Sequence, residues 1–432
     1  TVLSRKAGAA PEEGVQWEAN ADGEFSVETL TRPERGTAVT LHLKEDAREF
    51  ADPWRIRSLI TRYSDHIAFP VLMRKEGEAS LDYEAVNQAK ALWTPSRSEL
   101  TDDEYKQFFQ HVSHDHSEPL AWSHNKVEGK REYTSLLYIP GRAPFDLWQR
   151  DAARGLKLYV KRVFIMDDAE QFLPLYLRFV KGVIDSADLP LNVSRELLQQ
   201  DPEVEAIRGS LTRRVIDLLT RLATDEPDKY RTFWKEFGAV LKEGLAEDRS
   251  NRDKLMPLLR FASSREEGNE ATVSLKQYME RMQPGQERIY YVIADSVEAA
   301  RASPYIEQLR ERNIEVLLLG ERIDEWVMGQ LENFEGKRFK DAARGDLELG
   351  ALAGAAPEVK GNKELLKRVK DALGDKVTEV RLSTRLTESP AVLVLGEHDL
   401  GANMRRILAA AGQNAPQARP ALELNVDHAL VK

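Results

Sequence analysis

The residues with the clearest potential for chemistry lie in the stretch Asp188–Gln200, which reads DLPLNVSRELLQQ. Asn192 and Ser194 are both good helix N-cap residues, and the apolar pair Leu197-Leu198 begins a buried helix face. Arg195 therefore falls in the first helical turn, where the helix dipole is already positive. A cation suits that position if an anion binds there, because a guanidinium and free backbone N–H groups both fit phosphate oxygens. The alternative is a surface arginine paired with an acidic neighbour.

A second group of titratable side chains is a histidine cluster. His111, His114 and His116 follow one another closely, and His124 is near them in the sequence. Histidines at such intervals can bind zinc. No helix would present all of them on one face, however, and the carboxylates do not stand at ligand spacing. We therefore interpret the cluster as a polar loop and predict no metal site.

Familiar phosphate-binding and nucleophile motifs are missing from the sequence. No Gly-rich run precedes a Lys-Ser/Thr pair, no G-x-G-x-x-G occurs, and no G-x-S-x-G elbow is found. The segment from residue 288 onward has the pattern of a nucleotide-binding fold without its phosphate loop. We therefore interpret it as scaffold.

Two predicted helices carry apolar stripes that have two interpretations. The helix predicted over residues 322–334 has Trp326 beside its stripe and Met328 well off it, and the helix predicted over 400–411 has one face formed by Leu400, Met404, Ile407, Leu408 and Ala411. One interpretation is core packing. The other is a partly exposed surface that binds unfolded chains, because Met adapts to many partners and Trp offers a large contact area.

Composition limits the class of protein. The 432 residues include 62 basic and 72 acidic side chains, for a formal charge of −10, and no cysteine. The length suggests about three domains. No apolar run approaches the ~20 residues of a membrane span, so we expect no membrane partner. Thiol chemistry is excluded, and the acidic balance argues against a nucleic-acid partner.

Periodicity predicts the elements that must position these residues. Residues 1–50 alternate as strands, and a helix follows over 47–64. Beyond Trp93 we predict strands over 132–139 and 157–165, and helices over 170–179, 204–223 and 230–241. From residue 288 a β-α-β-α pattern indicates a parallel sheet, with strands over 288–294 and 315–319 and helices over 297–312 and 322–334. After a Gly/Ala-rich linker, we predict a helix capped by Asn362, strands over 377–382, 391–395 and 421–424, and the helix over 400–411.

Several stretches, taken in order, resemble the bacterial branch of the ninety-kilodalton heat-shock chaperone family. The resemblance covers essentially the whole chain, and it rests on order and spacing rather than on any single motif. The stretches are Arg35–Leu43, Tyr63–Ile67, Leu92–Thr94, Trp122–Gly129, Pro144–Leu147, Asp188–Gln200, Leu259–Phe261, Tyr278–Met282, Ile289–Tyr291, Glu315–Leu319 and Asp324–Trp326.

The resemblance implies a multidomain fold that mixes α/β and α+β architecture. Residues 1–74 would be the remnant of an α/β sandwich that binds ATP. Residues 88–350 would be the middle domain, with a large α/β part (88–225), a helical connector (226–285) and a small α/β part (286–350) that holds the parallel sheet. Residues 362–432 would be a truncated, mixed α/β C-terminal domain. Because the chain starts at Thr1 in a strand-like pattern and ends without a polar tail, we expect it to be part of a longer protein.

The resemblance also implies roles for single residues. Arg195 and Gln199 match the family's catalytic loop, in which an arginine reaches the γ-phosphate of ATP, and Asn192 belongs to the same loop. Thr37 matches a family residue near the adenine. Client contacts would lie at Trp326, Met328, Met404, Ile407 and Leu408. The family's other ATP-pocket motifs are not found in this sequence.

The function implied is that of a cytoplasmic, homodimeric, ATP-driven chaperone for stress response and protein folding, with unfolded clients and co-chaperones as partners. The full-length protein would be a slow ATPase that uses ATP with Mg²⁺. We expect this chain alone to bind no cofactor tightly and to be inactive. The alternative is a DNA-acting ATPase of the gyrase and mismatch-repair superfamily, against which the acidic charge argues.

Overall fold

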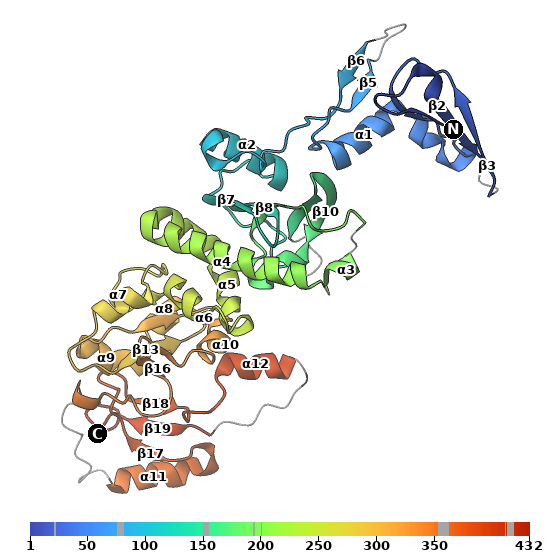
Figure 1. The fold of residues 1–432 in the computed structure, drawn as a ribbon. Helices are drawn as coiled ribbons and strands as arrows, with labels where there is room; N and C mark the ends of the chain where they lie inside the picture. Colours follow the sequence, from blue (N-terminus) through green and yellow to red (C-terminus); the bar gives the residue numbers. More distant parts are fainter. Residues whose placement is uncertain are drawn as a thin grey trace. The chain divides into compact units, whose positions relative to one another are not determined.

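A computed structural model describes residues 1–20, 23–75, 82–149, 155–192, 195–199, 201–352, 363–410, 412 and 419–432 (Figure 1). Its contacts divide the chain into two compact units, residues 1–91 with 162–164 and residues 92–161 with 165–432. None of the helices in the described part combines the length and the apolar composition that a membrane span requires. The combination of several mixed sheets with helices confirms the predicted α/β and α+β multidomain class, whereas the predicted domain boundaries stay predictions.

The first unit contains an antiparallel sheet whose strands are β1 (Val2–Arg5), β2 (Gly14–Ala19), β3 (Phe25–Leu30) and β4 (Gly36–Val39), in the spatial order β3-β2-β1-β4. A separate ladder joins β5 (Leu72–Arg74) to β6 (Tyr83–Ala85). The predicted helix over 47–64 is split into a 3₁₀ segment, η2 (Glu45–Ala51), and α1 (Pro53–Ser64). The break falls at Asp52, which is extended before Pro53 and caps α1 by accepting from the Trp54 N–H at 2.9 Å.

The second unit begins with a mixed sheet in the order β10-β9-β11-β8-β7. Its strands are β7 (Ala121–Val127), β8 (Tyr133–Ile139), β9 (Leu156–Val160), β10 (Val163–Ala169) and β11 (Lys181–Ser186). The helices of this part are α2 (Asp102–Ser113), α3 (Arg195–Gln199), α4 (Pro202–Asp225) and α5 (Pro227–Glu247), followed by α6 (Arg252–Leu255) and α7 (Leu275–Glu280). The core runs without interruption from this sheet through α4 and α5 to Ile289 and Leu317 of the next sheet.

Two predictions in this part are wrong. The strand predicted over 157–165 is two strands, β9 and β10, separated by Lys161 and Arg162, which both have positive φ (51° and 65°). The helix predicted over 170–179 is two 3₁₀ turns, η4 (Glu170–Phe172) and η5 (Leu175–Leu177). Pro174 explains the second error, because the residue before a proline is held extended and a continuous helix cannot form.

The next sheet has the order β12-β14-β13-β16-β15, and its central strands are parallel, as predicted. It is built from β12 (Ala262–Ser263), β13 (Arg288–Ile293), β14 (Leu317–Leu319), β15 (Asn333–Phe334) and β16 (Lys337–Asp341). The helix predicted over 297–312 is broken at Ser303-Pro304 into α8 (Val297–Arg301), η7 (Pro304–Ile306) and α9 (Glu307–Glu311).

The helix predicted over 322–334 is also wrong, although the burial it predicted is right. Only α10 (Asp324–Met328) is helical, and the chain returns as the β15–β16 hairpin. The hairpin turn is Glu335-Gly336, where both residues have positive φ (47° and 81°), as a two-residue turn of this kind requires. Val327, Leu331 and Phe334 are all buried, but one helix does not carry them.

The C-terminal part follows the prediction closely. It contains α11 (Lys363–Leu373), β17 (Val380–Leu382), β18 (Ala391–Val394), α12 (Ala402–Ala410) and β19 (Ala421–Leu424), and its sheet has the order β17-β19-β18. Asn362, the predicted cap of α11, lies outside the described residues. Arg385, fully buried, anchors this part: its Nε donates to Glu423 at 2.9 Å and its Nη atoms donate to the carbonyls of Ala342 and Gly345.

Gly182 in β11 allows the close strand packing that leads into the Asp188 loop. It has a φ of +145°, and a Cβ there would lie 2.1 Å from the carbonyl oxygen of Leu136 in β8. We predict that Gly182→Ala lowers the free energy of unfolding by about 3 kcal/mol, because the clash is with backbone that cannot move aside. Urea unfolding followed by circular dichroism measures this change.

Gly209 in α4 is the matched control. A Cβ there meets nothing within 4 Å, and the backbone is helical. Gly209→Ala should raise the free energy of unfolding by about 0.5–1 kcal/mol, because alanine loses less conformational entropy than glycine in a helix. Equal unfolding midpoints for the two variants would contradict the close approach at Gly182.

Candidate functional site

The loop that starts at Asp188 is fixed to the end of β11 by side-chain caps. The Oγ atom of Ser186 accepts from the N–H groups of Asp188 and Leu189, both at 3.3 Å. The carboxylate of Asp188 in turn accepts from the N–H of Glu132 at 2.7 Å, next to the start of β8. These contacts hold the first residues of the loop against two neighbouring strands.

Buried apolar side chains anchor both ends of the loop, and other residues of the loop are exposed, Leu191 among them. Leu189 at the start of the loop and Leu198 in α3 are buried, at 4% and 1% exposure, and both belong to the main core. Asn192 and Gln199 are exposed. Arg195 is the first residue of α3, as the sequence predicts, whereas Ser194 lies outside the described residues. The loop therefore has a fixed base and an accessible polar side.

Thr37 lies in the other compact unit, on the edge strand β4. Its Oγ1 and the Oγ of Ser4 on β1 lie 2.8 Å apart, across a pair of residues in antiparallel register. Thr37 is exposed.

The short helix α10 is held from two sides by consecutive carboxylates. Asp324, 2% exposed, accepts from Lys242 of α5 at 2.8 Å and from the N–H of Glu321 at 2.9 Å. Burial acts to lower the pKa of Lys242, but Asp324 and Glu321 outweigh it and raise this pKa above its usual value. Lys242 therefore stays charged under α10.

The next carboxylate, that of Glu325, reaches the N-terminus of α12. Its Oε2 accepts from the N–H of Met404 at 3.0 Å, which satisfies one of the free donors in the first turn. Its Oε1 lies 3.2 Å from Arg344, which also donates to the carbonyl of Asp399 at 2.8 Å. A Cβ on Gly401 would lie 2.0 Å from Glu325 Oε1, so a glycine is required for this approach.

The residues predicted to contact clients meet partly at this junction. Trp326 on α10 is 37% exposed, and Met404 and Leu408 on α12 are half-buried. Ile407 lies in the same helix, α12. Met328 is buried at 4% exposure and packs in the core, so it cannot be part of an exposed surface.

The histidine cluster has structural roles and brings no metal ligands together. His124 on β7 contacts the Tyr105 hydroxyl at 2.8 Å and the carbonyl of Trp93 at 2.9 Å, and burial lowers its pKa. His114 ends α2 in a left-handed conformation. Among the described residues, no group of His, Asp and Glu is arranged to hold a metal ion.

Comparison with known proteins decides the family. A family model described as "Hsp90 protein" matches residues 72–432. The chaperone protein HtpG of Shewanella amazonensis (strain ATCC BAA-1098 / SB2B) is 53% identical over 449 residues, which cover 100% of this chain and 70% of that protein. The chain belongs to the Hsp90 family.

Membership of the Hsp90 family makes the protein an ATP-dependent molecular chaperone, as the sequence resemblance implied. The alternative of a DNA-acting ATPase has no support from these comparisons. The sequence did not reveal the contact between Glu325 and α12, because it joins residues 79 positions apart. The one available signal was Gly401 in the first turn of the helix predicted over 400–411, because glycine is among the residues that occur at the start of helices.

We predict that Glu325→Ala loosens α12 in this Hsp90-family chain. The N–H of Met404 would lose its acceptor and Arg344 one of its carboxylates, which costs about 1–2 kcal/mol. Hydrogen exchange of the α12 amides should therefore accelerate by about tenfold. Gly401→Ala should have a similar effect, because its Cβ would displace the same carboxylate.

Glu332→Ala serves as the control, since Glu332 is exposed and follows α10. The α12 amides of the Glu332→Ala variant should exchange at the same rate as those of the unmodified chain. Unchanged exchange in Glu325→Ala would show that α12 does not depend on this cap.

Proposed function

We propose that this chain is the middle and C-terminal scaffold of the chaperone, and that it supplies Arg195 to an ATP site held mostly by a nucleotide-binding domain. The observation that carries the proposal is the loop at Asp188–Gln199, whose base is fixed by Ser186 and Leu198 while its polar side is accessible. A fixed base keeps an arginine in position when the domains approach each other.

The chemistry of the loop fits this role. A guanidinium near the γ-phosphate stabilises the charge that develops on the phosphoryl oxygens, and its planar fork suits two of them. Gln199 and Asn192 add exposed amides that can donate hydrogen bonds. ATP with Mg²⁺ is the cofactor proposed for the full-length protein, with Thr37 near the adenine. We assign no Mg²⁺ ligand among the described residues, in which no metal-binding group is found.

The client surface in this proposal consists of Trp326, Met404, Ile407 and Leu408. It is supported by the placement of Trp326 on α10 beside α12 and by the exposure of this indole. Unfolded segments would contact this surface through apolar side chains of varying shape, which Met accommodates well. Homodimerisation, co-chaperone binding and a cytoplasmic location complete the proposed function.

Arg195→Ala in the full-length protein should reduce kcat for ATP hydrolysis at least about 100-fold, with a smaller change in KM. The reason is that the guanidinium contacts the phosphoryl group mainly in the transition state. Gln199→Ala should reduce kcat less. A steady-state assay of phosphate release measures these changes.

Arg208→Ala is the matched control for charge, because Arg208 is half-buried on α4 and its ion-pair partner is Glu205, one turn earlier in the same helix. It should keep the kcat of the unmodified protein. A full kcat in Arg195→Ala would remove Arg195 from the ATP site and favour a scaffold without a link to the nucleotide.

Trp326→Ala and Met404→Ala should weaken the suppression of aggregation of a heat-denatured client. We expect about three- to tenfold more chaperone to be needed for half-maximal protection, as for the loss of a central interface residue. Light scattering of the client measures protection. Trp54→Ala, at an exposed tryptophan of the first compact unit, is the control. Full protection of the client by both Trp326→Ala and Met404→Ala would show that these two side chains only contribute to packing.

A further inference from the structure

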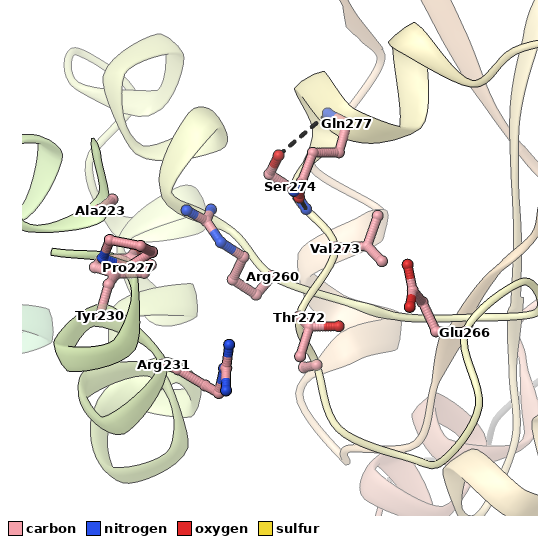
Figure 2. A pocket seen from close by; sticks show the side chains of 11 residues that line it. Ala223, Pro227, Tyr230, Arg231, Arg260, Glu266, Thr272, Val273, Ser274 and Gln277 are labelled. Carbon is pink, nitrogen blue, oxygen red and sulfur yellow. Dashed lines mark hydrogen bonds between the residues drawn. The ribbon is translucent and has the colours of Figure 1, made fainter. Parts of the chain in front are cut away.

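A cavity of about 440 Å³ lies at the start of α5, away from the catalytic loop and the client surface. It is lined by the end of α4, by the first turn of α5, by Arg260 and by the segment 271–274 (Figure 2). A second cavity, of about 390 Å³, shares Arg231, Arg260 and Ala271 with it. The two arginines therefore border both cavities.

Arg260 is a half-buried cation without a carboxylate partner among the described residues. Its guanidinium stacks on the ring of Tyr230 at 4.6 Å, and its Nη1 donates to the carbonyls of Pro257 and Leu259 at 3.1 and 2.9 Å. Burial lowers its pKa, because the charged form is desolvated. No hydrogen-bond acceptor is found for its Nε and Nη2 among the described residues, so these N–H groups can donate to an anion in the cavity.

Arg231 brings a second positive charge to the same space. Figure 2 shows it extending from α5 toward Thr272, across the opening from Arg260. Its carboxylate partner is Asp228, one turn earlier and 3.4 Å away, and both side chains are mostly exposed, at 60% and 89%. Such a surface pair is weak, so it leaves the Arg231 charge available to a ligand.

The acidic lining of the cavities does not neutralise these arginines. Glu266, the carboxylate in the wall of the first cavity, is bound to Arg281 at 2.7 Å. In the wall of the second, Glu321 and Asp324 are bound to Lys242, and Glu270 is exposed. The space between Arg231 and Arg260 therefore carries an excess of positive charge.

Hydroxyl groups complete the donor set. Thr272 and Ser274 line the same wall, and the Ser274 Oγ accepts from the N–H of Gln277 at 3.2 Å (Figure 2). Because that bond uses a lone pair, the Ser274 hydroxyl hydrogen is free to point into the cavity.

We propose that this cavity is a binding site for a small organic anion, whose phosphate or carboxylate oxygens are held by Arg260 and Arg231 and by the Thr272 and Ser274 hydroxyls. The arginine forks match both oxyanions, and hydrogen bonds between charged groups are the strong ones. Since one wall belongs to α4 and α5 and the other to the segment 271–277, a bound anion joins these elements and stabilises them by mass action.

Isothermal titration of the full-length protein with inorganic pyrophosphate and, separately, with citrate tests the site. We expect saturable binding of at least one, weaker at high salt because the exposed Arg231 is screened. The anion that binds shows whether the site recognises phosphate or carboxylate oxygens. Arg260→Gln should weaken binding at least about tenfold, and Arg231→Gln should also weaken it. Failure of both anions to bind would overturn the proposal.

Arg213→Gln provides the matched loss of charge. Arg213 is on α4 and donates to the carbonyl of Gly209 outside the cavity, so its variant should bind like the unmodified protein. If Arg213→Gln weakened anion binding as much as Arg260→Gln does, the loss of binding would reflect overall charge, and the proposed site would be wrong.

Thr272→Trp keeps both arginines and fills the space, so it should abolish binding. This variant, with Arg231→Gln, decides the question even if Arg260→Gln unfolds, since Arg260 also packs on Tyr230. Undiminished binding in Thr272→Trp and Arg231→Gln would place the anion elsewhere.

Discussion

Two consecutive carboxylates, Asp324 and Glu325, determine how the second compact unit is connected. Asp324 points inward to Lys242 of α5, and Glu325 points to the first turn of α12. A helix of five residues is too short to be stable by its own hydrogen bonds, so these contacts fix its position. Trp326, the next residue, then stays on the surface next to α12. The exposure of the proposed client surface therefore depends on polar contacts, not on apolar packing alone.

The sequence pattern predicted which residues are buried better than it predicted whether a helix or strand is unbroken. The sequence predicted the parallel strands β13 and β14, the long helices α4 and α5, and the order of helices and strands in the C-terminal part. Most of the errors have one of two physical causes. Pro53, Pro174 and Pro304 interrupt apolar patterns that look continuous, and a proline rule applied strictly would have found these breaks. The Lys161-Arg162 turn carried no such signal, because neither residue favours positive φ, and tertiary contacts determine it.

The proposed catalytic loop at Asp188 was accessible to sequence reasoning only in part. Its helix start and the position of Arg195 followed from capping preferences, but physical chemistry alone favoured a surface ion pair for Arg195. The proposal of a catalytic Arg195 comes from the family resemblance. The cavity at Arg260 shows the opposite case: its tyrosine stack and its wall from the segment 271–274 come from parts of the chain separated by tens of residues. Neither a motif nor a period in the sequence joins them.

Ionic contacts at the α10 junction have a consequence for a protein that changes shape. Buried ion pairs add little net stability compared with apolar packing, because desolvation offsets most of their attraction, but they are demanding in geometry. A junction made of Asp324, Glu325, Arg344 and the N-terminus of α12 is therefore specific in one arrangement without being strongly bound. Small rearrangements can exchange its partners for water at low cost. That combination suits the proposed client surface, because Trp326 and α12 are positioned by specific contacts that contribute little net binding energy.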